Sequence, residues 1–233
     1  MVLDMKNKIR MCLPVMLMLG STVWSEPSPE LVKEPAFQQA TEPSSQQVSE
    51  QVIEQAIDAG REAAVKGDYA TALAEWQPLA DNGNSIAQFN VGMLHALGNG
   101  VPQSYDEAAK WFTKAAEQGQ RDGQAKIGSM YARGLGVEQD YEQAAKWLYE
   151  AALQHHPHSQ FELGVLYANG QGVGRDESMA YFWFGVAAAQ NYEPAYEGQK
   201  KLLKYMVPQQ IEAVQKQVAE WLEANSRDIW PAE

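Results

Sequence analysis

The chain has 233 residues, 45% of them hydrophobic, with 30 acidic against 18 basic side chains and a formal net charge of −12. This hydrophobic content is enough to form a packed core. A chain with this excess of acidic residues is not expected to bind nucleic-acid phosphates or an anionic membrane surface. Its single cysteine excludes an intramolecular disulfide and a thiolate zinc site. We therefore expect no nucleic acid among its partners.

The first 25 residues have the order of a secretory signal peptide. Three basic residues lie near the start: Lys6, Lys8 and Arg10. An apolar run over 11–19 follows, and small residues then precede a cleavage position near Ser25. The run is too short to span a bilayer as a helix, which disfavours the alternative of a retained anchor. Cys12 stands at the front of the run rather than after it, so we do not expect lipidation.

Cleavage near Ser25 would remove the only cysteine and leave 15 bases and 29 acids, a net charge of −14. We predict a periplasmic or secreted protein with no membrane span in its mature form. Residues 26–50 are rich in Pro, Ser, Gln and Glu, and their few apolar side chains show no helical period. Such a segment cannot bury enough surface to offset its ordering entropy, so we predict a disordered linker. The alternative is a docking peptide built on Phe37.

The rest of the chain repeats with a period of 36 residues. The recurring sets include Gln88, Gln124 and Gln160; Gly92, Gly128 and Gly164; Gly98, Gly134 and Gly170; Gly100, Gly136 and Gly172; and Trp111, Trp147 and Trp183. So many coincidences at one offset indicate a repeat protein. We place full repeats at 84–119, 120–155 and 156–191. A degenerate repeat over 51–83 precedes them, and a partial repeat with a C-terminal capping helix over 192–233 follows.

Each unit predicts two helices joined by a glycine-containing turn. In the first full unit, apolar residues at helical spacing predict a helix over about 85–97, which Gly98 ends. Ser104 then caps a second helix, with Glu107 in the capping-box position. The equivalent caps in the next two units are Asp140 and Asp176. Neither helix can bury its apolar face alone, so the units must stack, with the tryptophans filling the gaps between neighbouring hairpins.

Segments such as QAKIGSMYARGLGV (124–137), followed by AAKW (144–147), carry a family resemblance. They resemble Sel-one-like repeats, which are relatives of the tetratricopeptide repeat, and the resemblance covers about 52–223. It implies an all-α, right-handed solenoid of stacked antiparallel helix hairpins. Its members act mainly as adaptors, and in bacteria they are often exported and linked to envelope assembly, host interaction or signalling. A cysteine-rich branch is associated with penicillin binding or β-lactam hydrolysis, but its disulfide in each repeat cannot form in a mature chain without cysteine.

Positions that differ between the repeats predict a binding surface, because stacking imposes nothing there. On the first helices they follow the spacing i, i+3, i+7, which is one helical face. They are Asn90, Met93 and Leu97; Lys126, Ser129 and Arg133; and Glu162, Val165 and Asn169. Since first helices typically line the concave side of such a stack, we predict that this stripe binds a protein or peptide. Met93 and Leu97 would form an apolar end, and Lys126 and Arg133 would place two cations in the middle. The alternative is a merely solvated face.

Three of the four histidines cluster in the turn between repeats, at His155, His156 and His158. Three imidazoles could bind zinc or copper, or sense pH near 6. No carboxylate or thiol lies within the cluster, however, so we expect an exposed turn and no metal. His95 takes the position of Tyr131 and Tyr167 in the next repeats, which predicts a packing role.

The sequence offers no catalytic constellation. Its glycine-rich pieces follow predicted helices rather than strands and recur with the repeat, so they are interhelical loops and not nucleotide-binding turns. We predict a monomeric, non-enzymatic adaptor without a cofactor. The alternatives are a cell-wall or β-lactam hydrolase, and a metal-binding protein that uses the histidine turn.

Overall fold

The computed structural model of the protein describes residues 45–226, and the side chains among them from Ser49 onward. The described residues form helices and no strand. In chain order these are α2 (Ser45–Val65), α3 (Tyr69–Asp81), α4 (Ser85–Leu97), α5 (Tyr105–Glu117), α6 (Arg121–Arg133), α7 (Tyr141–Leu153), α8 (Pro157–Asn169), α9 (Glu177–Ala189), α10 (Glu193–Leu202), the 3-10 helix η1 (Leu203–Tyr205) and α11 (Pro208–Ala224). The predicted signal peptide and the first part of the predicted linker lie outside the described residues. None of the helices described is long and apolar enough to cross a membrane.

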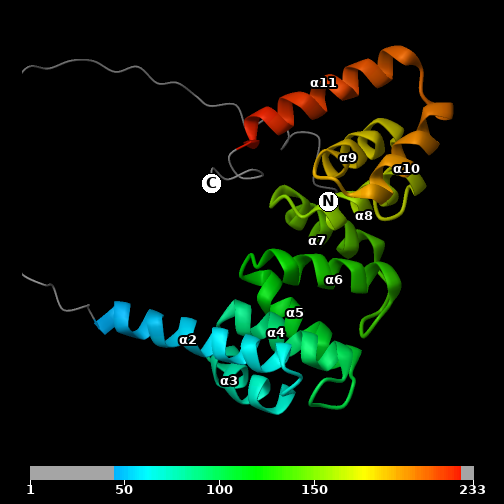
Figure 1. The fold of residues 1–233 in the computed structure, drawn as a ribbon. Coiled ribbons are helices and arrows are strands. Elements are labelled where there is room, and N and C mark those ends of the chain that lie inside the picture. Colours follow the sequence, from blue (N-terminus) through cyan, green and yellow to red (C-terminus); the bar gives the residue numbers. More distant parts are fainter. Residues whose placement is uncertain (1–44, 227–233) are drawn as a thin grey trace, which may run out of the picture. The chain divides into compact units, whose positions relative to one another are not determined.

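Consecutive helices pair into hairpins that stack in sequence order (Figure 1). The pairs are α2 with α3, α4 with α5, α6 with α7, and α8 with α9, and each second helix also packs on the first helix of the next pair. After the last pair, α10 packs on α9 as a further first helix, and α11 also packs on α9. The predicted all-α stack of hairpins with a C-terminal capping helix is confirmed.

Helix α2 begins earlier than the sequence predicted. Residues 45–50, which we assigned to the linker, are helical. Ile57 is buried in α2, and its carbonyl oxygen accepts a hydrogen bond from Trp76 Nε1 at 3.1 Å, which anchors the helix on α3. From this anchor the helix extends back through serine, glutamine and glutamate, residues that a helix tolerates. Pro43, two residues before α2, disfavours a further turn.

The predicted caps are confirmed. The side chains of Ser104, Asp140 and Asp176 accept hydrogen bonds from backbone N–H groups in the first turns of α5, α7 and α9. The first helices α4, α6 and α8 end at Gly98, Gly134 and Gly170, each in the left-handed conformation. Local sequence therefore sets both ends of these helices.

Glycines in the first helices let the two helices of a pair approach closely. A Cβ atom on Gly92 would lie 2.8 Å from the Phe112 ring, and one on Gly164 would lie 2.7 Å from the Phe184 ring. The tryptophans join the pairs to one another, as predicted. Trp111 packs on the cluster formed by α2, α3 and α4, and Trp147 packs on the cluster formed by α5 and α6. The recurring glycines and tryptophans thus define packing within and between pairs.

A ladder of buried glutamine side chains runs through the stack with the period of the repeat. Gln160 is completely buried, donates from Nε2 to the carbonyl oxygen of Ala152 at 3.0 Å, and accepts from Gln190 Nε2 at 2.8 Å. Equivalent pairs of bonds are made by Gln88 with Ala80 and Gln118, and by Gln124 with Ala116 and Gln154. At the next repeat position, Tyr196 donates its hydroxyl proton to the carbonyl oxygen of Ala188 at 2.7 Å. Each of these carbonyl oxygens also accepts a backbone N–H of the following turn, so the ladder gives it a second partner and ties each second helix to the next first helix.

Candidate functional site

The nine predicted binding residues lie on the first helices of three successive pairs. We call them the first-helix stripe: Asn90, Met93 and Leu97 on α4; Lys126, Ser129 and Arg133 on α6; and Glu162, Val165 and Asn169 on α8. All nine are at least partly exposed. The first helices are also spatial neighbours, since α6 contacts α8 and α8 contacts α10. The stripe faces of α6 and α8 therefore lie next to each other, and α10 follows them.

Glu162 joins two helices of the stripe. From α8, its carboxylate accepts a hydrogen bond from Ser129 Oγ and pairs with Arg133 Nη2 at 3.0 Å. The Glu162 side chain is only 15% exposed, so this contact is partly shielded from water. Of the two cations that the sequence predicted in the middle of the surface, Arg133 is thus paired. For Lys126, the described part of the chain provides no ion pair, so the two predicted cations differ in their surroundings.

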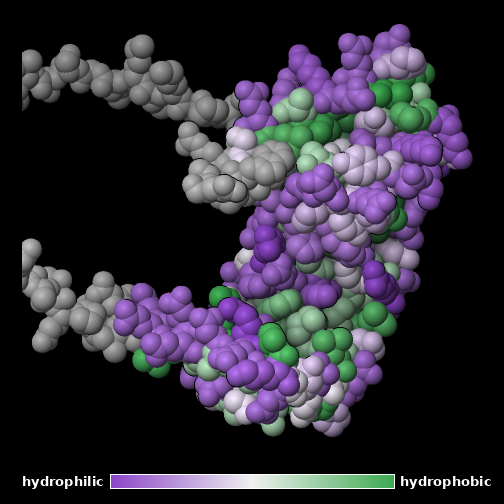
Figure 2. Space-filling model, viewed as in Figure 1, coloured by the Kyte–Doolittle hydropathy of each residue, from purple (hydrophilic) through white to green (hydrophobic). Residues whose placement is uncertain are grey.

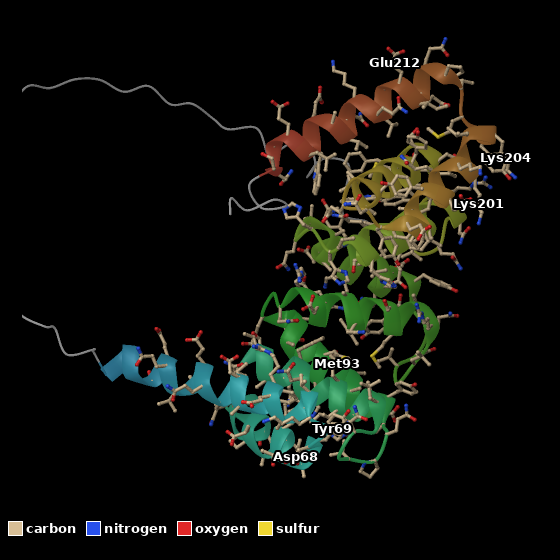
Figure 3. The ribbon with its side chains drawn as sticks, in the orientation of Figure 1. Asp68, Tyr69, Met93, Lys201, Lys204 and Glu212 are labelled. Carbon is tan, nitrogen blue, oxygen red and sulfur yellow. The ribbon has the colours of Figure 1, made fainter. Side chains whose placement is uncertain are left out.

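A groove of about 640 Å³ lies between α4 and α6. Five stripe residues line it: Met93, Leu97, Lys126, Ser129 and Arg133. Phe89 and Leu135, which the sequence analysis did not single out, add apolar surface. Phe89 corresponds to Ala125 in the next repeat, so comparing every exposed position between repeats would have found it. Apolar side chains interrupt the polar surface over this part of the molecule (Figure 2), in the region where Met93 is labelled (Figure 3).

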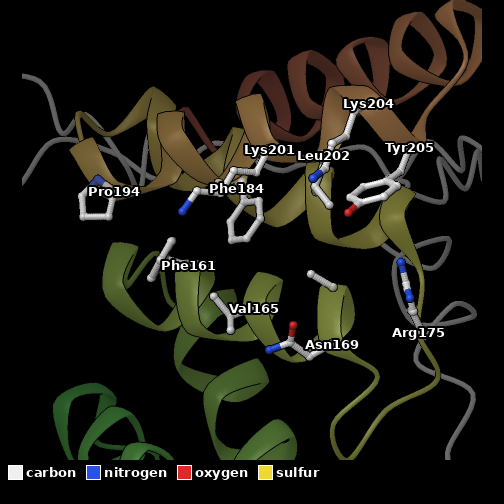
Figure 4. A pocket seen from close by; sticks show the side chains of 12 residues that line it. Phe161, Val165, Asn169, Arg175, Phe184, Pro194, Lys201, Leu202, Lys204 and Tyr205 are labelled. Atoms are coloured by element: carbon white, nitrogen blue, oxygen red, sulfur yellow. The ribbon is translucent and has the colours of Figure 1, made fainter.

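A second groove, of about 580 Å³, lies between α8 and α10 (Figure 4). Val165 and Asn169 of the stripe line it from α8. Asn90 lines neither groove, and Glu162 lies between the two, where it bridges α6 and α8. The structure therefore divides the predicted stripe into two separate grooves, because a side chain from one repeat reaches across to the next.

The histidine turn has a different contact for each imidazole. His155 adopts a positive φ of 60° and packs its ring against Trp221 of the capping helix, with ring centroids 5.1 Å apart. His156 caps α8, and its Nδ1 accepts from the backbone N–H of Ser159 at 3.2 Å. His158 Nδ1 lies 3.5 Å from a Glu162 oxygen. Within residues 45–226 there is no cluster of three His, Cys, Asp or Glu side chains arranged to hold a metal ion.

His156 gives the protein a pH dependence of known sign. Burial is the main cause that lowers the pKa of His156, against the opposing effect of Asp122, whose Oδ1 lies 3.9 Å from Nε2. Three further charged or titratable groups face the ring: Arg121, Lys126 and His158. The capping bond also requires an unprotonated Nδ1, since protonated imidazole has no acceptor. Both effects favour the neutral ring in the folded state.

We expect the free energy of unfolding to fall as pH decreases below about 6.5, because the unfolded state takes up a proton that folded His156 resists. The replacement His156→Asn keeps a side-chain acceptor at the cap but removes this titration. Thermal unfolding followed by circular dichroism between pH 7.5 and pH 5 should show a smaller loss of Tm in the variant. An equal loss in both proteins would contradict the assignment.

Three exposed carboxylates, those of Glu62, Asp68 and Glu107, have lowered pKa values. Hydrogen bonds lower the pKa values of Glu62, Asp68 and Glu107, with Lys66, Thr71 and Lys110 as the respective donors. A general acid at neutral pH needs the opposite shift. These pairs are ordinary helix-surface and capping contacts.

Comparison with known sequences and structures adds the family context. The sequence model of the Sel1 repeat (the Sel-one-like repeat) matches residues 85–120, 121–156 and 157–192, one residue later than the repeats we placed. A Sel1 repeat protein from Oxalobacter formigenes is 37% identical; the match covers 55% of this chain and 97% of that chain, with a TM-score of 0.51. A protective antigen of uropathogenic Escherichia coli strains with an SLR fold is 23% identical, with a TM-score of 0.55 over 79% of this chain and 49% of that chain. No curated protein matches significantly.

Proposed function

This protein belongs to the Sel1 repeat family, whose solenoids generally act as scaffolds for protein–protein interaction, and from this premise we propose that it is an exported, non-enzymatic adaptor. We propose further that it captures a segment of a partner protein in the groove between α4 and α6. Export is supported by the signal-peptide order of residues 1–25 and by the loss of the only cysteine on cleavage. The place of action that fits is the cell envelope or the host interface.

The observation that carries the binding site is the composition of the α4–α6 groove. Its α4 side presents Met93, Leu97 and Phe89, and Leu97 is 58% exposed. Its α6 side presents the exposed cation Lys126. Stacking of the repeats does not require Met93, Leu97 or Lys126, because the equivalent positions of the other repeats carry different residues. Phe89 instead recurs as Phe161, and its ring contacts Phe112. An apolar surface beside the Lys126 cation, with Arg133 already paired to Glu162, suits a peptide side chain and a neighbouring carboxylate.

The double replacement Met93→Asp with Lys126→Glu is expected to abolish partner capture. It removes the apolar anchor and reverses the charge opposite the partner's carboxylate, which at such a contact costs about 2–4 kcal/mol, or 30-fold or more in affinity. Mature protein and variant are immobilised, incubated with envelope extract, and the bound proteins are quantified by mass spectrometry. A partner that binds the wild type should be lost from the variant.

The matched control is Lys216→Glu on α11, where the side chain is 78% exposed and lines neither groove. This control should retain the partner. Capture that is equal in all three proteins would place the binding surface elsewhere. Turnover of nitrocefin by the pure mature protein, unaffected by the groove replacements, would contradict the non-enzymatic assignment.

A further inference from the structure

The groove between α8 and α10 differs in charge from the α4–α6 groove. Phe161, Val165 and Asn169 line it from α8, and Leu202 lines it from the last turn of α10 (Figure 4). Three basic side chains also line it: Arg175, Lys201 and Lys204. The chain as a whole carries −12, so this gathering of cations around an apolar groove runs against its overall charge.

Two of these cations, Arg175 and Lys204, lie near the aromatic ring of Tyr205. Tyr205 lines the groove and is 58% exposed. The Lys204 ammonium lies 4.7 Å and the Arg175 guanidinium 6.0 Å from the centre of its ring. Arg175 is also paired with Glu177 at 2.9 Å. For Lys201 and Lys204, the structure of residues 45–226 contains no ion pair, so two positive charges remain for a ligand.

The repeat explains why this groove is open and cationic. Gly198 of α10 stands 36 residues after Glu162 of α8, at the same position of the repeat. Glu162 bridges α6 and α8 and pairs with Arg133, whereas Gly198 carries no charge and lies against the Phe184 ring, which an added Cβ atom would meet at 2.9 Å. By the same offset, Lys201 replaces Val165 and Tyr205 replaces Asn169. The first-helix stripe therefore continues onto α10 with its sign of charge reversed relative to α8.

We propose that this groove is a second binding site, for an extended acidic segment of a partner protein. An apolar side chain of the segment occupies the floor beside Phe161 and Leu202, and carboxylates on either side of it meet Lys201 and Lys204. Charge complementarity favours this ligand, because an acidic segment is repelled by most of this acidic protein's surface and attracted by Lys201 and Lys204. A nucleic acid is disfavoured because its dense phosphate charge would face the surrounding acidic surface.

The site is independent of the α4–α6 groove and is tested separately from it. The probe is a fluorescein-labelled peptide, Glu-Glu-Trp-Glu-Glu-Leu, and the matched probe has lysine in place of each glutamate. Fluorescence anisotropy with the mature protein should show binding of the acidic probe that weakens as salt increases from 50 to 300 mM, and no binding of the basic probe. In a 15N-labelled sample, the amide signals of Val165 and Gly198 should shift on titration.

The double replacement Lys201→Glu with Lys204→Glu should weaken binding of the acidic probe at least tenfold. The control, Lys110→Glu with Lys216→Glu, changes the net charge by the same amount at two exposed lysines that line neither groove. This control should retain the affinity within about threefold, because only the weak long-range effect of the changed net charge remains. The groove variant Met93→Asp with Lys126→Glu should also retain it, which separates this site from the proposed adaptor function.

Several results would overturn the proposal. These are no binding of the acidic probe at 1 mM protein, equal binding of the basic probe, and equal weakening by both double replacements. If a twelve-nucleotide oligothymidylate bound more tightly than the acidic peptide, the groove would be a nucleic-acid site and the peptide proposal would be wrong. Circular dichroism melts of the two lysine double variants should match the wild type, since all four lysines are exposed at the surface.

Discussion

Replacing Gly136 with alanine should lower the free energy of unfolding by about 2–5 kcal/mol, one of the two largest effects that we expect from a single substitution. Gly136 has a φ of +66°, where a Cβ atom costs about 1–2 kcal/mol. That Cβ would also lie 2.1 Å from the carbonyl oxygen of Tyr105, the first residue of α5 in the preceding pair. Neither backbone can move without opening the contact between successive repeats.

Two other glycines separate these contributions. Gly119 shares the positive φ, at +80°, but an added Cβ would meet no atom within 4 Å, so Gly119→Ala should cost only about 1–2 kcal/mol. Gly174 has neither the positive φ nor a neighbour, and Gly174→Ala should stay within about 0.5 kcal/mol of the wild type. Urea unfolding followed by circular dichroism measures all three. If Gly136→Ala were no worse than Gly119→Ala, the close approach of the turn to α5 would be refuted.

Replacing Gln160 with leucine is the second large effect that we expect, a loss of about 1–3 kcal/mol. Leucine fills a similar volume but can neither donate to the Ala152 carbonyl oxygen nor accept from Gln190 Nε2. The Ala152 carbonyl oxygen keeps the backbone N–H of His155 at 3.1 Å, and Gln190 Nε2 keeps only its long contact of 3.4 Å with the Val186 carbonyl oxygen. The expected loss is therefore that of two buried hydrogen bonds with one donor left poorly satisfied, about 1–3 kcal/mol. The same unfolding measurement, with thermal melts in parallel, gives the difference from the wild type.

Gln139→Leu is the matched control for the glutamine ladder. Gln139 likewise donates from Nε2 to a helix carbonyl oxygen, that of Ala132 at 2.9 Å, but in an exposed position. Water can satisfy that carbonyl oxygen in the variant, so the loss should stay below about 1 kcal/mol. Equal losses for the two variants would mean that burial of the ladder has no energetic consequence.

The sequence predicted the fold well, because the repeat multiplies each local signal. Ser104, Asp140 and Asp176 stand at one position of the repeat, and all three cap helices. Helix α2 was the exception. The degenerate repeat differs from the three full repeats, so it could not be aligned with them to find where its first helix begins. Because residues 45–50 are mostly polar, the sequence assigned these six helical residues to the linker. The recurrence of Gln160 and its equivalents was visible, but their role as a buried ladder was not, since each bonds to residues of two other helices.

The candidate site depended far more on tertiary structure. Variability between repeats correctly placed Met93, Lys126 and their neighbours on exposed first-helix faces, because helical spacing fixes which side chains share a face. It could not show that Glu162 reaches Arg133, 29 residues away, and so neutralises a cation that the sequence counted as available.

By itself the sequence determined the helices, their caps and the order of the stack, since these follow from residues within one turn or one repeat of each other. Only the tertiary structure decided where the surface opens. One stripe of variable positions became two grooves because a glutamate bridges α6 and α8 whereas a glycine stands at the same position of α10. Contacts between side chains of different repeats depend on how the repeats stack, which no spacing along the chain records.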